Sequence, residues 1–214
     1  MATLLHIDSS AVGSESVSQS VANLIRQEWR GDVIYRDLAQ EPVAPITAAQ
    51  VAARNIPSEE LSTELKEATV LQDRLIEEFL AADAYLFAVP MYNYSVPAAF
   101  KAWIDQIVVL GRTLPLPGTS SPTAGRPAIV VSARGGFGYG LGGPGQARDF
   151  VLPWLQLILG DTLGLDLRSI TLEGTLAPVI PAYESLIATY EQSLRDAEDQ
   201  ARHEARNLTE HLAA

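Results

Sequence analysis

The sequence contains no cysteine, so disulfide bonds, thiol catalysis and thiolate metal sites are excluded from the start. Histidine is also scarce, with three in the whole chain. The pair His203-Glu204 begins like a zinc-protease motif, but Asn207 stands where the second histidine of that motif would be. We therefore expect no metal site.

Long hydrophobic runs are absent as well, since no apolar stretch approaches the roughly 18 residues that a membrane-spanning helix needs. His6 and Asp8 interrupt the first apolar run after a few residues, unlike a secretory signal. The patterns G-x-x-x-x-G-K-[ST] and G-x-S-x-G do not occur. These absences predict a cytoplasmic protein with no membrane partner, and they give no support to nucleoside triphosphate hydrolysis or serine hydrolysis.

Basic residues are few: 15 Lys and Arg against 26 Asp and Glu give a net charge of −11. Such a chain has no basic surface to neutralise phosphates, which argues against nucleic-acid binding and against anionic membranes. Charged residues of both signs make up only 19% of the chain, below the roughly 25% usual for globular proteins. We therefore expect much of the surface to be covered, by an extensive core or by a partner subunit.

Short apolar runs alternate with longer segments of helical periodicity, a pattern typical of a parallel α/β sheet. At 214 residues we expect a single domain, 1–214. The expected strands are Thr3–Asp8, Asp32–Asp37, Ala84–Pro90, Pro127–Ala133 and Leu167–Glu173. The expected helices are Ser18–Trp29, Ser62–Ala81, Pro97–Leu110, Asp149–Leu159 and about the last 30 residues. Five parallel strands with helices on both faces predict a three-layer, flavodoxin-like fold with strand order 2-1-3-4-5.

Two other segments are expected to lack regular strands or long helices. Leu38–Ser58 is rich in Pro and Ala and is expected to be a loop with one or two helical turns. Thr113–Gly125 is rich in Pro, Gly, Ser and Thr, which indicates a mobile flap. The C-terminal helix would be roughly 45 Å long, so its far end is expected to fray or to meet a partner.

The loops that follow neighbouring parallel strands converge on one crevice, which is where such sheets bind ligands. The first of these loops begins with Ser9-Ser10, and Ser18-Gln19-Ser20 opens the following helix. A helix start offers unpaired N–H groups and the positive end of a dipole, so Ser10, Ser18, Gln19 and Ser20 suit a phosphate. The alternative is that Ser18 is simply the N-cap of the helix.

The second loop, Met91-Tyr92-Asn93-Tyr94, directly follows a buried strand and is stiffened by Pro90 and Pro97. A thioether, two aromatic rings and an amide offer an apolar platform with specific hydrogen bonds, which suits a flat heteroaromatic ring. The alternative is that Tyr92 and Tyr94 only pack at the top of the sheet.

The third loop, Ala133-Arg134-Gly135-Gly136, lets a planar ligand approach the backbone closely, although a tight turn would also explain its glycines. Downstream, residues 138–143 match G-x-G-x-x-G formally. They follow the fourth strand rather than the first, and Pro144 interrupts the helix start, so this is not a dinucleotide fingerprint. We expect a flexible loop over the site instead.

Together the three loops resemble those of the FMN-dependent NADH-azoreductase family of quinone reductases, in order and in spacing, over nearly the whole chain. The resemblance implies a flavodoxin-like homodimer that binds one FMN per subunit at the subunit interface. It implies hydride transfer from NADH or NADPH and two-electron reduction of a quinone or an azo compound, in a ping-pong reaction. By position, Ser10 and Ser18–Ser20 would hold the phosphate and ribityl chain, Met91–Tyr94 would contact the ring, and Ala133–Gly136 would line its pyrimidine side.

The sequence departs from that family at a few positions. Gly138 stands where members often carry a histidine, so Tyr139 or water is the candidate proton donor. Ile158 stands where an aromatic residue often lines the pocket, and Thr113–Thr123 lacks the aromatics often found there. The expected dimer seam is the helix from Pro97 together with the C-terminal region.

Two other functions remain open from the sequence. One is a flavin-binding regulatory subunit that senses redox state and docks to another protein. The other is a flavodoxin-like carrier of single electrons. The sequence does not distinguish NADH from NADPH, because it holds no separate dinucleotide fingerprint.

Overall fold

The computed structural model describes residues 1–54 and 56–213, and its centre is a five-stranded parallel sheet in the order β2-β1-β3-β4-β5. The predicted strand order is therefore confirmed. The strands are β1 (Thr3–Asp8), β2 (Asp32–Asp37), β3 (Ala84–Ala88), β4 (Pro127–Ala133) and β5 (Asp166–Leu172). All four neighbouring pairs are parallel, so the carboxyl ends of the strands meet at one edge.

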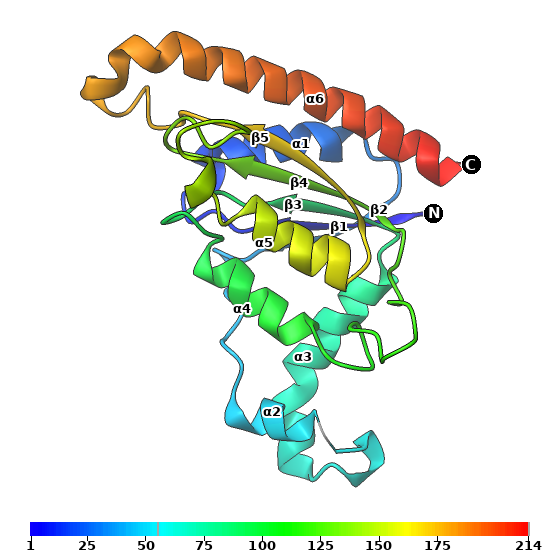
Figure 1. Cartoon of the computed structure of the whole chain (residues 1–214). Coiled ribbons are helices and arrows are strands. Elements are labelled where there is room, and N and C mark those ends of the chain that lie inside the picture. The colour runs from blue at the N-terminus through cyan, green and yellow to red at the C-terminus, as the bar shows by residue number, and fades with distance from the viewer. Residues whose placement is uncertain (55, 214) are drawn as a thin grey trace.

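Helices cover both faces of this sheet (Figure 1). One face carries α1 and the long α6, and the other carries α3, α4 and α5, with α2 farther out beside α3. The helices are α1 (Val17–Glu28), α2 (Ala48–Ala53), α3 (Thr63–Ala81), α4 (Ala98–Ile107), α5 (Leu152–Leu155) and α6 (Ile187–Ala213). Short turns of 3-10 helix are η1 (Gly13–Glu15), η2 (Ser58–Glu60), η3 (Gln146–Arg148) and η5 (Pro181–Leu186). Among the described residues, no helix is both long and apolar enough to cross a membrane.

The central strand β3 is buried along its whole length, because helices lie against both of its faces. On the α3 and α4 side its side chains join an aromatic cluster with Phe79, Phe100 and Trp103. The ring centroids of Phe79 and Tyr85 are 4.9 Å apart, and those of Phe100 and Trp103 are 5.6 Å apart. The Tyr85 hydroxyl donates to the Phe79 carbonyl at 2.8 Å, and burial raises the pKa of this hydroxyl to about 12.

The helix expected over Asp149–Leu159 is wrong in its type and its bounds. Helix α5 is a single turn that continues as the π-helix η4 (Gln156–Thr162). The buried residues Leu155, Leu159 and Leu163 recur at intervals of four. Residues four apart share one face of a helix, so this spacing predicts a helix with a buried face but not whether its turns are α or π.

The Pro- and Ala-rich segment after β2 contains α2, as the expected one or two helical turns, and buried glutamines fix its position. Gln50 of α2 donates to the side chain of Gln106 in α4 at 3.0 Å. Gln106 in turn donates to the Ala44 carbonyl, and Gln72 of α3 donates to the Gln106 carbonyl, both at 2.9 Å. These amides hold α2 against α3 and α4.

The segment expected to be a mobile flap is anchored by two fully buried threonines and lies at the amino-terminal edge of the sheet. Thr113 accepts from the Val109 N–H at 3.1 Å, and the Thr123 hydroxyl donates to the Leu163 carbonyl at 2.8 Å. The segment leads from α4 to the start of β4, so in its own chain it does not cover the carboxyl-edge loops (Figure 1).

Truncating the aromatic cluster tests how much this face stabilises the fold. We expect Phe79→Ala to lower the free energy of unfolding by about 3–5 kcal/mol, because it removes a fully buried ring and leaves a cavity. Urea unfolding measures the change. Val70→Ala on the exposed face of the same helix is the matched control and should change stability by less than about 0.5 kcal/mol. Equal effects of the two substitutions would contradict this assignment of the core.

Candidate active site

The three loops singled out in the sequence contact one another at the carboxyl edge of the sheet. The Tyr92 hydroxyl lies 3.3 Å from Ser10 Oγ and accepts from the Ala11 N–H at 3.0 Å, which joins the first loop to the second. The Met91 N–H donates to the Ala133 carbonyl at 2.8 Å, which joins the second loop to the third. The predicted convergence of the loops is therefore confirmed.

A cleft of about 380 Å³ opens between these loops. Of the predicted site residues, those in its wall are Ser10, Ser18, Met91, Tyr92, Ala133 and Gly135. Its volume is within the range of roughly 300–1,000 Å³ typical of small-molecule sites. The wall combines hydroxyl groups at one end with apolar and backbone surface at the other, as a flat ligand with a phosphate tail requires.

The hydroxyl-rich end of the cleft is the start of α1. Ser16, rather than Ser18, is the N-cap: its Oγ accepts from the Gln19 N–H and lies 3.1 Å from Ser18 Oγ. The N–H groups of Val17 and Ser18 have no hydrogen-bond partner among the described residues. Two free donors at the positive end of a 12-residue helix make this end suitable for an anion.

Gln19 and Ser20 belong to the first turn of α1 but not to the cleft wall. Gln19 is only 6% exposed, yet its Nε2 has no partner in the described part of the chain. A buried amide donor without a partner is rare in folded proteins and indicates that a ligand or water completes its hydrogen bonding. Ser20 is exposed on the surface of α1.

The second loop is a tight hairpin turn with an unusual backbone. Tyr92 and Ser95 exchange two backbone hydrogen bonds, and the central residues Asn93 and Tyr94 both have positive φ, 49° and 70°. This conformation suits asparagine but is strained for tyrosine by about 1 kcal/mol or more. The Phe150 N–H donates to the Tyr94 carbonyl at 3.0 Å and helps to hold the turn.

The turn places Asn93 and Tyr94 differently from the other predicted residues. Their side chains are exposed, and neither lines the cleft of this chain. Their N–H groups have no partner among the described residues, so the backbone of the turn is free to donate to a ligand. Asn93 also contributes, with Tyr92, to a second hollow on the α4 side of the turn, near Lys101 and Trp154.

In the third loop the backbone reaches the cleft, but the side chain of Arg134 turns away from it. The buried guanidinium donates to the Ser132 carbonyl at 2.9 Å and to Asp149 Oδ2 at 2.7 Å. Asp149 Oδ1 accepts from the N–H groups of Val151 and Leu152, at 2.8 and 3.3 Å. Arg134 therefore anchors the third loop to the start of α5, and only its main chain remains available to a ligand.

Eight residues of the cleft wall were not among the predicted site residues: Val12, Glu15, Ser16, Val17, Pro90, Thr175, Leu176 and Val179. The last three belong to the loop after β5, which follows the third loop closely. The Thr175 N–H donates to the Arg134 carbonyl at 3.1 Å, and the Leu176 N–H donates to the Gly135 carbonyl at 3.2 Å. The rule that loops after neighbouring strands share one crevice would have found this fourth loop.

Tyr139, the candidate proton donor, lies against the third loop. A Cβ added to Gly136 would be 3.4 Å from the Tyr139 hydroxyl, so this hydroxyl is close to the backbone of Gly136. Phe137 and the glycines that follow bring it there from the end of β4.

Below the first loop, Asp8 is buried at the end of β1. Its carboxylate accepts from the Tyr35 hydroxyl at 2.8 Å and has His6 Nε2 at 3.0 Å. Burial raises the pKa of the Tyr35 hydroxyl, and the hydrogen bond to Asp8 raises it further. Asp8 therefore joins β1 to β2 by a side-chain hydrogen bond.

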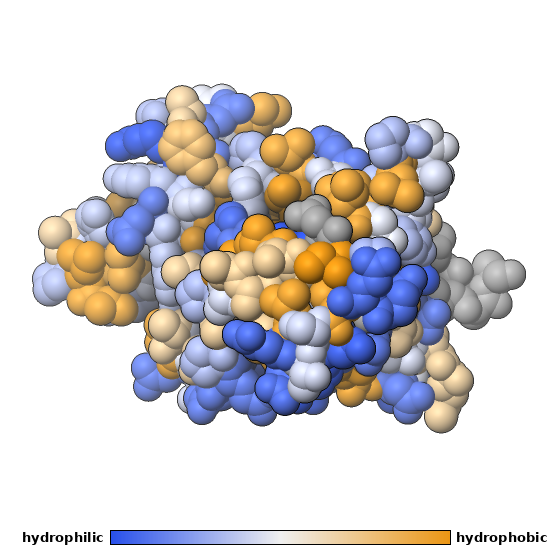
Figure 2. Space-filling model, turned by 90° about the horizontal axis from the view of Figure 1, so that it is seen from below, coloured by the Kyte–Doolittle hydropathy of each residue, from blue (hydrophilic) through white to orange (hydrophobic). Residues whose placement is uncertain are grey.

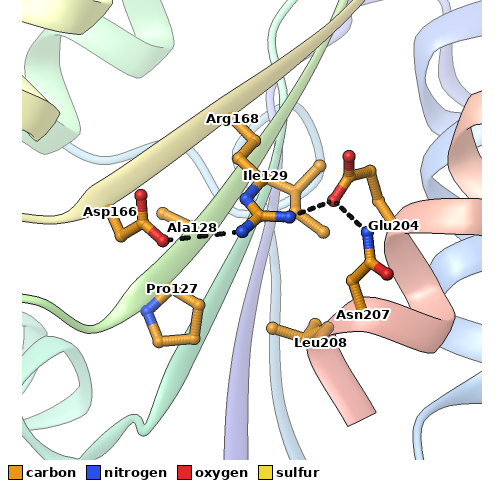
Figure 3. A pocket seen from close by; sticks show the side chains of 8 residues that line it. All are labelled: Pro127, Ala128, Ile129, Asp166, Arg168, Glu204, Asn207 and Leu208. Atoms are coloured by element: carbon orange, nitrogen blue, oxygen red, sulfur yellow. Dashed lines mark hydrogen bonds and ion pairs between the residues drawn. The ribbon is translucent and has the colours of Figure 1, made fainter. Parts of the chain in front are cut away.

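A different pocket lies at the opposite edge of the sheet, between the starts of β4 and β5 and the end part of α6 (Figure 3). Arg168 lies between two carboxylates there, 3.9 Å from Asp166 Oδ2 and 3.0 Å from Glu204 Oε2. The hollow measures about 20 Å³, room for about one water molecule. Its charges are paired with one another, so this pocket is not the candidate site.

The doubly covered parallel sheet and the cleft at its carboxyl edge define a flavodoxin-like protein. The chain belongs to the family described as Flavodoxin-like fold, whose model matches residues 2–196.

Within that family, the chain is similar to curated proteins named FMN-dependent NADH:quinone oxidoreductase. It is 44% identical over 220 aligned positions to the protein of that name from Streptomyces coelicolor, covering 100% of this chain and 98% of the relative. It is 42% identical over 207 positions to the one from Frankia casuarinae, covering 94% and 98%.

Among solved structures, the fold is similar to that of an FMN-dependent NADH-azoreductase from Bacillus anthracis in complex with FMN. The TM-score is 0.79 with 20% identity, over 97% of this chain and 99% of that one. At this identity the likeness concerns the fold.

The buried ion pair of the third loop provides a test of how the cleft is held. We expect Asp149→Asn to lower the free energy of unfolding by about 3 kcal/mol, because it leaves the Arg134 guanidinium buried without a counter-charge. The Asn side chain keeps an oxygen for the Val151 N–H, so the helix start is preserved. Thermal and urea unfolding measure the change. The double variant Arg134→Met/Asp149→Asn removes both charges and should restore part of the lost free energy of unfolding. If it restores none, the unpaired Arg134 charge is not the cause of the destabilisation.

Proposed function

We propose that this chain is an FMN-dependent oxidoreductase that takes a hydride from NADH or NADPH and passes two electrons to a quinone, and also to aromatic azo compounds. The observation that carries the proposal is the cleft at the carboxyl edge of β1, β3 and β4, which joins free helix N–H groups to an apolar wall. The names of the relatives support FMN as cofactor, NADH as donor and a quinone as acceptor. The azoreductase neighbour supports the azo compounds.

The residues present fit FMN by their chemistry. The phosphate requires donors, and the start of α1 supplies free N–H groups at Val17 and Ser18 and the unpartnered amide of Gln19. The ring requires a flat apolar surface with a hydrogen-bonding rim, and Met91 and Tyr92 line the cleft beside free backbone donors. None of the described residues that line the cleft is Lys or Arg, so neutral donors alone would bind the phosphate.

Bound FMN would supply the hydride and two-electron chemistry, and the protein would orient it and tune its charge. Ser10 and Ser18 in the cleft wall and the unpartnered amide of Gln19 would hold the phosphate and ribityl chain, whereas the exposed Ser20 does not line the cleft. The backbone N–H groups of the second and third loops would stabilise negative charge on the reduced ring.

The other residues of the cleft wall and its neighbouring loop would contact the ring or hold the loop in place. Met91 and Tyr92 would exclude water from one side of the ring, and Ala133, Gly135 and Gly136 would let its pyrimidine side approach the backbone. Arg134 acts by anchoring that loop, through its pair with Asp149. Tyr139 would hold a proton at its hydroxyl, close to Gly136, for the reduced acceptor.

We also propose that the protein is a homodimer with an FMN at each subunit interface. Apolar side chains are exposed at the carboxyl edge, among them Tyr94, Phe150 and Val179, where a second copy would cover them. Figure 2 shows hydrophobic residues gathered on the face near α2, and Val51 in α2 is 48% exposed. Helix α2 adjoins α4 through Arg54, which donates to the Asp105 carbonyl at 2.6 Å. These surfaces favour α4 as part of the dimer seam.

The C-terminal region is the other candidate for the seam. Ala197, Ala201, Ala205 and Leu208 of α6 are already buried within this chain, so a partner would meet the opposite face of the helix. The expectation that its far end meets a partner concerns side chains beyond Thr209, which lie outside the described residues. We propose a cytoplasmic location, because the reaction needs a supply of NADH or NADPH.

The proposed function is tested by loading and turnover. We expect purified protein, incubated with FMN and freed of the excess, to retain about one FMN per chain with two visible absorption bands. Anaerobic NADH should bleach these bands, and a soluble benzoquinone should restore them. A protein that retains no FMN would refute the assignment of the cleft. Retained FMN that neither NADH nor NADPH reduces would refute the enzyme and favour a carrier or a regulatory subunit.

Gln19 provides a sharper test of the phosphate end. We expect Gln19→Met to raise the dissociation constant of FMN about tenfold, because it removes a buried donor of nearly the same shape. The stability of the flavin-free protein should stay within about 0.5 kcal/mol, since the Nε2 atom has no protein partner to lose. Quenching of FMN fluorescence measures the affinity. The matched control, Gln27→Met on the exposed face of the same helix, should leave it unchanged.

A further inference from the structure

The segment from Phe137 to Gly145 contains five glycines, and two of them, Gly138 and Gly142, have positive φ of 84° and 78°. A glycine-rich segment loses more conformational entropy when it becomes ordered than a segment of other residues does. A fixed shape for this loop therefore depends on strong anchors outside the loop.

The first anchor is the carboxylate of Glu173, directly after β5. Its Oε2 accepts from the Gly138 N–H at 2.7 Å, and its Oε1 accepts from the N–H groups of Tyr139 and Gly140 at 2.8 and 3.1 Å. Three successive N–H groups thus surround one carboxylate, as in the backbone nests that bind anions. Hydrogen bonds to a charged acceptor are about twice as strong as neutral ones.

The second anchor is the contact of Phe137 with Gly174. Gly174 has φ +82°, and a Cβ added there would lie 2.1 Å from Phe137 Cζ, so only glycine leaves room for the ring. The Gly174 N–H donates to the Gly136 carbonyl at 2.8 Å. The Glu173 N–H donates to Ser193 Oγ at 3.0 Å, which connects this anchor to α6.

The Glu173 carboxylate interacts with the backbone of the glycine-rich loop. In the part of the chain that the structure describes, no Lys or Arg forms an ion pair with it, and the three N–H groups are its side-chain partners. Because Tyr139 is the middle one of the three donors, the same carboxylate sets where the Tyr139 ring lies. Its hydroxyl lies beside Gly136, the residue that follows Gly135 of the cleft wall.

We propose that Glu173 is a positioning residue that holds the glycine-rich loop beside the Gly135 end of the cleft and fixes Tyr139 against the acceptor. This rests on the proposed function. Leu141 at the tip of the loop is 97% exposed, and the hydrogen bonds at the tip are local: the Gly142 N–H donates to Gln146 Oε1 at 2.7 Å and the Gly143 N–H to the Gly140 carbonyl at 2.9 Å. Loss of the anchor would therefore loosen the attachment of the loop to the end of β5. The anchor would then determine how tightly the acceptor is bound, while the transfer from NADH to the ring proceeds without it.

Hydrogen–deuterium exchange tests the anchor itself, on the flavin-free and the FMN-loaded protein. We expect Glu173→Gln to speed exchange of the amides at 138–140 by about tenfold or more, because the carboxamide NH₂ group faces an N–H donor instead of accepting from it. Glu191→Gln, an exposed carboxylate of α6, is the matched loss of charge and should leave these amides unchanged. Unchanged exchange in Glu173→Gln would overturn the proposal.

Kinetics tests whether the anchor acts through Tyr139. We expect Glu173→Gln to raise the KM for a naphthoquinone by roughly three- to tenfold, with the rate of anaerobic flavin reduction by NADH within about twofold of the native rate. In a Tyr139→Ala background the same substitution should add little, since coupled residues are not additive. An equal rise in both backgrounds would overturn the role assigned to Glu173. The exchange measurement needs no flavin, so a protein that binds no FMN refutes the proposed function without being mistaken for a failed anchor.

Discussion

The hydrogen-bond register of the parallel sheet continues past the ends of its strands, and the candidate site depends on this continuation. The Met91 N–H reaches the Ala133 carbonyl, and the Thr175 N–H reaches the Arg134 carbonyl, in the direction in which β3, β4 and β5 pair. Each loop is therefore fixed by its neighbour rather than by its own sequence. Side chains add further links: the Tyr92 hydroxyl meets Ser10 between the first two loops, and the Glu173 carboxylate accepts N–H groups of residues 138–140 between the loops after β5 and β4. A cleft built this way holds its shape because opening one loop disturbs the pairing of the next.

Some of the many carboxylates of this acidic chain stabilise loops at the carboxyl edge of the sheet. Several carboxylates accept backbone N–H groups and thereby hold loops in place: Asp37 those of Ala39 and Gln40, Asp149 those of Val151 and Leu152, and Glu173 those of residues 138–140. The cleft wall itself contains one carboxylate, Glu15, and no Lys or Arg among its described residues. An anionic ligand would therefore depend on neutral donors and on the dipole of α1, whose effect falls off within the first turn.

Much of the architecture could be predicted from local patterns. The bounds of β1, β2 and β4 agree with those expected, and the parallel order follows from alternating apolar runs and helical periodicity. The π turns at Gln156–Thr162 could not be predicted, because the spacing of the buried Leu155, Leu159 and Leu163 suits an α-helix equally well. The position of Thr113–Gly125 also required the fold, since composition indicates a loop but not the edge of the sheet at which it lies.

The sequence by itself determined the layers, the strand order and the three loops that meet at one edge, because periodicity and loop position follow from local chemistry. Only the tertiary structure decided how those loops are used. In the structure the Arg134 side chain pairs with Asp149 instead of entering the cleft, and Ser16 rather than Ser18 is the N-cap of α1. Leu176, from a fourth loop, lines the cleft wall. These outcomes depend on partners that are distant in the chain, and a side chain is directed by the partner that satisfies its charge or hydrogen bonds once it is buried.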